Sequence, residues 1–399
     1  MSRTQTTMSN PRLPPEMLDY VIDLLNDEPE ALKQCCLASK LWVPRTRRHL
    51  FADIAFRSAD DLVSWKKTFP DPTNSPAYHA RTVLVGCPGL ITASDAGEGG
   101  WIWTFSSITS LEVDNGEQYL GSLTPFYQFA PTLKSLRVGP LLFPCPQLFA
   151  LICSFPLLED LSLRGVSPSH DDDSHGMRTI YSYPGTSPSL TGSLDLAILG
   201  GAGSVARLLL GLSSGLHFRK ITFTWDRKED RRWITELVAS CSHTLESLDI
   251  TYAFRRTFAR ICVFTNLILF LVGQEHALLD LSKATKLQDA IFRPQSKSVE
   301  WIATALQTLT PEHQDLRQIS IYVPHHLTIF SPGADIRHYL GEASEWWSRL
   351  DHLLLRFWES RSVRPRVGCA RAGEKWQNTK YCIGCLLPEV TKREIVDPV

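Results

Sequence analysis

A short apolar pattern recurs through most of this 399-residue chain. Each copy has the form apolar-x-x-apolar-x-apolar, so its fourth and sixth residues would share one face of a β-strand. Clear copies begin at Ile108, Leu133, Leu158, Phe218, Leu245, Leu316 and Leu350, and weaker copies at Ala80, Thr191 and Leu287. Two successive intervals are 25 residues and two are 27. A strand that returns at such intervals through a helix stacks in parallel on the strand before it, so the pattern predicts an α/β solenoid.

Leucine-rich chains easily produce isolated copies of this pattern by chance, but the matched intervals between copies argue against a chance origin here. Helix-like stretches at 146–158 and 231–245 lie between copies, as a strand–helix repeat requires. The asparagine that commonly follows the strand in leucine-rich repeats is mostly absent, so we expect irregular repeats over 77–360. A polar segment rich in Pro, Gly, Ser and Asp predicts a loop insertion at 165–190. Residues 251–286 interrupt the register without a clear assignment.

Residues 12–51 have a different pattern and predict three short helices. Pro14 and Pro15 suit the start of a helix, because proline fixes the backbone angle and its missing N–H would be unpaired there. Leu18, Val21, Ile22 and Leu25 follow at the spacing of one helix face. Before this segment, residues 1–11 are polar and predict a disordered N-terminus that is not a secretory signal.

A second helix is expected to begin at Pro29, and Ser39 is a candidate N-cap for a third that runs through Trp42 to Leu50. Pro44 should make the third helix kink or restart. Three helices in about 40 residues cannot bury their own apolar faces. The rest of the chain or a partner must therefore cover them. A linker is expected at 52–76 and a C-terminal cap at 361–399.

Composition limits the partners. The formal charge of −1 argues against nucleic acid or an anionic membrane, because both require a basic surface. The longest apolar run, 261–272, is well short of the roughly 20 residues that span a bilayer. Ten cysteines in a chain without a secretory signal indicate reduced thiols, so we expect a cytoplasmic and/or nuclear protein.

No catalytic motif is present. The chain lacks a phosphate-binding loop, a G-x-S-x-G nucleophile and an H-E-x-x-H helix, and the glycines at 200–204 predict a turn. The polar cluster at 170–175 predicts a solvated loop more strongly than a metal site. Cys382 and Cys385 form a C-x-x-C pair that, with Cys369, leaves open a zinc site, a redox pair or ordinary thiols. We expect no enzyme activity, no metal and no cofactor.

The segment 12–51 resembles an F-box. The resemblance rests on L-P-x-E followed by Ile and Leu at helical spacing, then C-L-A-S-K-x-W and a closing basic-L-F. With the repeats behind it, the chain resembles the F-box/leucine-rich-repeat family. The segments near the C-terminus, such as LLLRFWESRSVRPRV, are similar to F-box proteins of mushroom-forming (basidiomycete) fungi. The alternative is an ordinary N-terminal helical cap.

The resemblance implies a substrate receptor of an SCF-type cullin–RING ubiquitin ligase. In that family the F-box docks on the Skp adaptor, and the repeats hold an unknown substrate protein. Carried over to this sequence, the docking surface would comprise Leu13, Pro14, Ile22, Leu25, Leu32, Cys36, Leu37, Ser39 and Trp42. Some of these would instead pack the helices together.

Substrate would meet the concave strand face of the repeats. Its candidate residues point outward from the strands: Glu112, Arg137, Asp160, Arg164, Thr222, Asp249 and Tyr322. Their mixed charges predict a polar, partner-specific surface. The competing hypothesis is a leucine-rich-repeat interaction scaffold without a link to a ligase.

Overall fold

The structure is a computed structural model. It describes residues 14–86, 100–114, 124–139, 142–143, 145–165, 167–168, 188–197, 202–225, 230–252, 279–294, 299–324, 327, 335–341, 343–361, 363–368 and 376–393. They divide into two compact units, one reaching Asp114 and including 124–133, and one from Lys134 onward. The fold is α/β, and every strand pair described in either unit is parallel.

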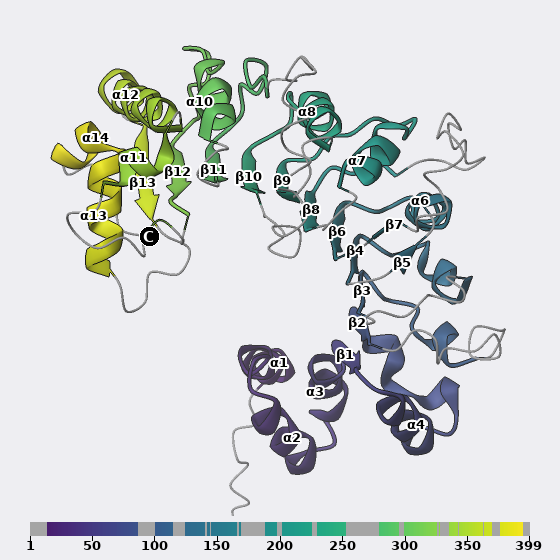
Figure 1. Cartoon of the computed structure of the whole chain (residues 1–399). Helices are drawn as coiled ribbons and strands as arrows, with labels where there is room; N and C mark the ends of the chain where they lie inside the picture. The colour runs from purple at the N-terminus through teal and green to yellow at the C-terminus, as the bar shows by residue number, and fades with distance from the viewer. Residues whose placement is uncertain are drawn as a thin grey trace, which may run out of the picture. The chain divides into compact units, whose positions relative to one another are not determined.

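The first unit begins with helices and continues as a small sheet (Figure 1). Its helices and strands are α1 (Pro15–Leu24), α2 (Pro29–Ala38), α3 (Val43–Leu50), β1 (Asp53–Phe56), α4 (Ala59–Thr68), β2 (Thr82–Val85) and β3 (Ser110–Val113). The described 3-10 helices between them are η1 (Pro72–Asn74), η2 (Pro76–His79), η4 (Trp101–Thr104) and η5 (Thr124–Phe129). The strands pair in chain order, β1 with β2 and β2 with β3.

Strand β1 lies inside the range predicted to be a linker. Phe51, Ile54 and Phe56 follow the repeated apolar pattern, and Ile54 and Phe56 are buried. An aromatic cluster covers this end of the sheet: the ring of Trp65 on α4 lies 4.6 Å from that of Phe69 and 5.7 Å from that of Phe56. The segment after the third helix is therefore part of the folded unit.

The second unit is a row of strands with helices between them. Its strands are β4 (Ser135–Val138), β6 (Asp160–Arg164), β8 (Ser193–Ala197), β9 (Lys220–Trp225), β10 (Ser247–Tyr252), β11 (Asp289–Arg293), β12 (Gln318–Tyr322) and β13 (Arg364–Gly368), hydrogen-bonded in that order. Strands β5 (Leu142–Phe143) and β7 (Ser167–Pro168) form a separate pair. The helices are α6 (Cys145–Cys153), α7 (Ala202–Leu210), α8 (Arg231–Ser240), α10 (Val299–Gln307), α11 (Ile336–Leu340), α12 (Ala343–Arg361), α13 (Trp376–Leu386) and α14 (Pro388–Lys392). Within this unit α7, α8 and α10 lie on one side of the strand row (Figure 1).

The apolar pattern of the sequence becomes a ladder of buried side chains. In the register of β8, β9 and β10, Leu196, Phe223 and Ile250 are neighbours, and all three are buried. The predicted strand is confirmed for the copies that begin at Ala80, Ile108, Leu133, Leu158, Thr191, Phe218, Leu245, Leu287 and Leu316. The prediction of parallel strands is confirmed as well.

The copy that begins at Leu350 was predicted as a strand, and this prediction was wrong. Leu350, Leu354 and Phe357 lie in helix α12 and are buried at the spacing of one helix face. The run of leucines satisfies the strand and helix patterns at once, so periodicity alone could not separate them. The last strand among the described residues is β13, in the range expected to be the cap.

Beyond β13, the C-terminal helices are fixed by a buried carboxylate. The oxygens of Asp351 on α12 accept the backbone N–H groups of Glu389 and Val390, at 2.8 and 3.0 Å, at the start of α14. Burial raises the pKa of Asp351 despite these hydrogen bonds. An otherwise unpaired helix end is thereby capped from another helix.

Several predictions concern residues outside those described. They are the N-terminus 1–11, Leu13, the polar cluster 170–175, the apolar run 261–272, Cys369, and most of the insertion 165–190 and of 251–286. In the parts that are described, no helix has the length and apolar character needed to cross a membrane.

Candidate functional site

Helix α1 is apolar on two faces. Its inner face carries Ile22, which is 2% exposed, beside the half-buried Leu18 and Leu25. Its outer face carries Met17, Tyr20, Val21 and Leu24, with exposed fractions of 51%, 61%, 47% and 64%. Their spacing of i, i+3, i+4 and i+7 places these four on one stripe. A helix that is apolar on both faces is normally covered on both.

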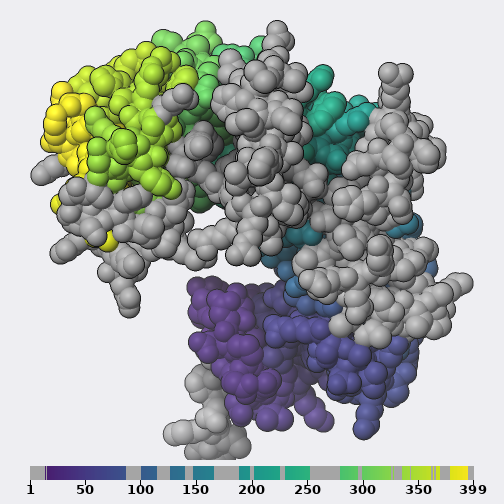
Figure 2. Space-filling view, in the orientation of Figure 1, coloured from purple at the N-terminus to yellow at the C-terminus, as the bar shows by residue number. Residues whose placement is uncertain are grey.

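Two further exposed leucines follow, Leu37 near the end of α2 and Leu41 in the turn after it, each 82% exposed. Thirteen large apolar side chains are exposed in the described residues, and six of them lie between Met17 and Leu41. Those six are Met17, Tyr20, Val21, Leu24, Leu37 and Leu41. They belong to the purple part of Figure 2. Single exposed apolar residues are ordinary, but six within 25 residues make this segment the candidate for a binding surface.

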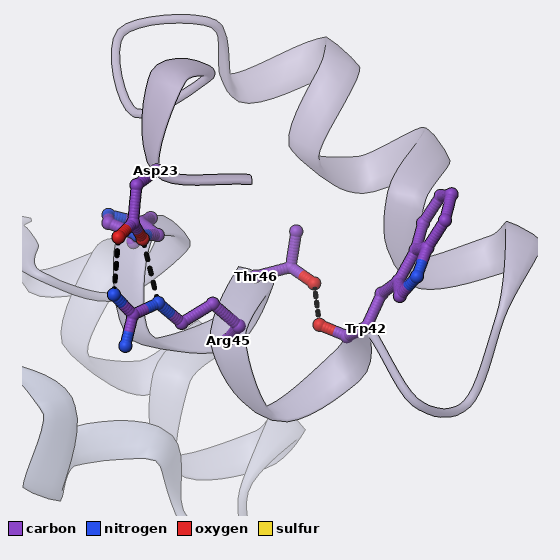
Figure 3. A network of polar contacts seen from close by, with 5 residues as sticks. Asp23, Trp42, Arg45 and Thr46 are labelled. Atoms are coloured by element: carbon purple, nitrogen blue, oxygen red, sulfur yellow. Dashed lines mark hydrogen bonds and ion pairs between the residues drawn. The ribbon is translucent and has the colours of Figure 1, made fainter. Parts of the chain in front are cut away.

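The three helices enclose a small core of their own. Ile22 of α1, Leu32 of α2 and Thr46 of α3 are all buried. The hydroxyl of Thr46 donates to the carbonyl oxygen of Trp42 one turn earlier (Figure 3). Because its polar atom is satisfied locally, Thr46 can occupy a core position.

A charged network links α1 to α3. Arg45 donates from Nε to one oxygen of Asp23, at 2.7 Å, and from a terminal nitrogen to the other oxygen (Figure 3). Nε2 of His49 lies 2.7 Å from the same carboxylate. The hydrogen bonds from Arg45 and then from His49 hold the pKa of Asp23 well below its usual range, and the Asp23 carboxylate raises the pKa of Arg45. The network fixes the helix that presents the outer stripe.

We expect the substitution Asp23→Asn to lower the free energy of unfolding by about 1 kcal/mol at pH 7. Asp23 is 36% exposed, so solvent limits the value of the pair. Since folding lowers the pKa of Asp23, its contribution is complete above its unfolded pKa of about 4 and is lost as the pH falls further. Urea titrations at pH 7 and pH 3 should show that the variant loses less stability than the wild type on acidification. An identical loss in both proteins would contradict this role.

The described residues that were predicted to contact the adaptor separate into three groups by exposure. Ile22 and Leu32 are buried, whereas Leu25, Cys36, Ser39 and Trp42 are half-buried. Pro14 and Leu37 are exposed. The sequence placed Val21 on one face with Leu18, Ile22 and Leu25, and this was wrong, because Val21 is 47% exposed on the outer stripe. The other members of that stripe, Met17, Tyr20 and Leu24, were not singled out from the sequence, although the outer stripe has the same periodicity as the inner face, offset by one position.

Ser39 was predicted to cap the third helix, and this was wrong. It is the C-cap residue of α2, and its hydroxyl accepts the N–H of Leu41 at 3.3 Å. Trp42 occupies the N-cap position of α3 without a side-chain cap. Helix α3 restarts at Val43, with Pro44 in its first turn, where a missing N–H has little cost.

The predicted substrate residues lie on strands in both units, and the structure brings some of them together. Asp249 on β10 pairs with Arg293 on β11, whose guanidinium lies 4.6 Å from the ring centre of Tyr322 on β12. Burial opposes the charge of Arg293, yet the Asp249 carboxylate keeps its pKa raised. Arg293 was missed, because its role depends on the register of three strands.

A second pair lies on β6 and β8, where Arg164 contacts Asp195 at 2.6 Å. Nearby, the carboxylate of Asp160 accepts the N–H and the hydroxyl of Ser193, each at 2.6 Å. Thr222, on β9, is half-buried. Glu112 and Arg137 are on β3 and β4, respectively. On these strands Arg164 is paired with Asp195 and Arg293 with Asp249, so the predicted surface carries paired charges of both signs.

The C-x-x-C pair lies in helix α13. Cys382 is buried and donates from Sγ to the carbonyl oxygen of Leu327 at 2.8 Å, and Cys385 is half-buried. Among the described residues, no group of three or more His, Cys, Asp or Glu side chains is arranged to hold a metal ion. The described side chains thus give Cys382 a packing and hydrogen-bonding role.

The sequence was also compared with known proteins. No family model matches this chain, and no curated protein matches it.

Proposed function

We propose that this protein is the substrate-recognition subunit of an SCF-type cullin–RING ubiquitin ligase. Its first three helices would dock as an F-box on the Skp adaptor, and the strand face of the repeats would bind the substrate protein. The observation that carries the proposal is the outer stripe of α1, whose four apolar side chains are left in water by the described residues. Such a ligase subunit would work in the cytoplasm and/or nucleus.

A partner that covered the outer stripe would gain free energy from the burial of its apolar side chains. Burying apolar surface is favourable by about 25 cal/mol per Å² removed from water. Because association also costs entropy, a few well-buried anchors must supply most of the binding energy. Tyr20 and Leu24, at the middle and end of the stripe, are suited to this role. The internal core of Ile22, Leu32 and Thr46 keeps the helices folded while the stripe remains available.

The proposed mechanism needs no bond-making by this chain. One surface would hold the adaptor and another the substrate, so a substrate lysine would be kept near a ubiquitin-charged enzyme. This would raise the effective concentration of the substrate lysine near the ubiquitin-charged enzyme, provided that both surfaces are occupied at once. The paired charges on β6–β8 and β10–β12 support a polar, partner-specific substrate surface.

The test is a binding measurement between the full chain and a basidiomycete Skp adaptor. We expect the wild type to bind and Leu24→Asp to weaken binding at least about 30-fold, equivalent to about 2 kcal/mol, because a charge would be buried at an anchor. Val63→Asp on α4 is the matched control, since Val63 is 63% exposed and Leu24 is 64% exposed. It should bind as the wild type does.

Two outcomes would favour the interaction scaffold instead. In one, the wild type does not bind the adaptor, and the helices serve only as the N-terminal part of the first unit. In the other, Leu24→Asp and Val63→Asp bind equally well, so the outer stripe is not the docking surface. The packing of α3 against η2 shows that these helices also have a structural connection to that unit.

A further inference from the structure

Two histidines from neighbouring repeats meet in the second unit. His217 lies in the turn between α7 and β9, and His243 lies in the turn between α8 and β10. Nδ1 of His217 is 3.0 Å from Nε2 of His243, and the ring centres are 5.1 Å apart with an angle of 80° between their planes. The two turns are held by main-chain bonds, including His217 N–H to Leu190 O and Thr244 N–H to Cys241 O. The two imidazoles are thus placed by the backbone of adjacent repeats.

The hydrogen bond between the two rings uses only part of their capacity to donate protons and to bind ligands. A neutral imidazole has one N–H and one lone pair, so one ring donates here and the other accepts. Among the described residues, no carboxylate pairs with either ring, and no third His, Cys, Asp or Glu completes a cluster. His243 is exposed and His217 is half-buried. Water therefore has access to the pair and could complete the coordination of an ion.

The separation of the two nitrogens matches chelation of one metal ion. Bonds from imidazole nitrogen to a divalent transition metal are about 2.0–2.1 Å long. Two nitrogens 3.0 Å apart would then subtend about 91–97° at the ion. Tetrahedral zinc would need a separation of about 3.3 Å, whereas an angle near 90° suits the tetragonal geometry of Cu²⁺ or Ni²⁺.

We propose that His217 and His243 form a two-histidine chelate for one divalent ion of tetragonal preference, Cu²⁺ or Ni²⁺, with water as the remaining ligands. The ring that now donates would exchange the proton on its facing nitrogen for one on its own distal nitrogen, so two neutral rings bind the ion without net proton release. The bound ion would join two successive repeats and stabilise the native state by mass action. This site is independent of the proposed ligase function.

The experiment titrates the purified full chain with Ni²⁺, because Ni²⁺ does not oxidise the free thiols. Calorimetry should show one site that weakens at least tenfold in His217→Ala and in His243→Ala. His338→Ala, which removes an exposed histidine from α11, is the matched control and should bind as the wild type does. The thermal midpoint should rise with Ni²⁺ in the wild type and the control only.

Far-ultraviolet circular dichroism establishes that each variant is folded before titration. If the two variants bind Ni²⁺ as tightly as the wild type, or the wild type shows no site and no rise in its thermal midpoint, the proposal is overturned. His243→Gln provides a second test, since it retains a polar side chain but not an imidazole, and it should lose the site as His243→Ala does.

Discussion

Replacing Phe223 with alanine is expected to lower the free energy of unfolding of the second unit by about 3–5 kcal/mol. Phe223 is fully buried on β9, and its register neighbours Leu196 and Ile250 are buried on either side. Truncation would leave a cavity in the ladder of apolar side chains, and the hydrogen-bonded strands on both sides limit how far the site can collapse. Because repeats are stabilised mainly by their neighbours, the loss should extend to β8 and β10.

Denaturant titration monitored by circular dichroism measures this effect, and hydrogen exchange locates it. Thr222→Ala is the matched control, because Thr222 is the preceding residue on β9, points to the opposite face and is only half-buried. Its expected cost is below about 1 kcal/mol. Equal losses for Phe223→Ala and Thr222→Ala would show that the buried ladder is not what stabilises this part of the chain.

The second large effect is expected for Ile22→Asp. Ile22 is 2% exposed between α1 and its neighbours, so the substitution would bury a charge without a partner. Such a change typically costs more than about 4 kcal/mol, which exceeds what three short helices can supply. We expect residues 14–50 to unfold, with a loss of helical signal and rapid proteolysis in this segment, while the second unit keeps its thermal transition.

The contrast with Leu24→Asp makes this prediction informative. Both variants should lose the adaptor, but only Ile22→Asp should become sensitive to protease. A folded, protease-resistant Ile22→Asp would mean that the inner face of α1 is not its packing face. A variant at Ile22 is accordingly a poor probe of docking, since failure to bind would follow from unfolding alone.

The strands could be predicted well from the sequence because their two-residue periodicity follows from which side chains are buried. A strand with buried residues two apart, returning after 25 or 27 residues, leaves few alternatives to a parallel stack. The same rule failed at Leu350, where three leucines in a row also fit a helix. It was not applied at Phe51, Ile54 and Phe56, which have the same spacing; Ile54 and Phe56 lie in β1.

The candidate docking surface was only partly predictable. The periodicity of α1 indicated a helix with an apolar face, and Ile22 does belong to that face. Which of two interleaved stripes turns inward depends on the packing of α2 and α3, and short-range spacing carries no information about that packing. The network of Asp23, Arg45 and His49 joins residues 22 and 26 positions apart, so it too required the fold.

In the second unit, each described strand of the long row is hydrogen-bonded to its neighbours in the row. A whole strand–helix module could therefore be gained or lost during evolution with damage confined to the new junction. Such changes would alter the length of the strand face and the side chains on it, while leaving the N-terminal helices unchanged. Under the proposed function, a lineage could in this way vary the substrate-binding face while the adaptor-binding helices stay unchanged.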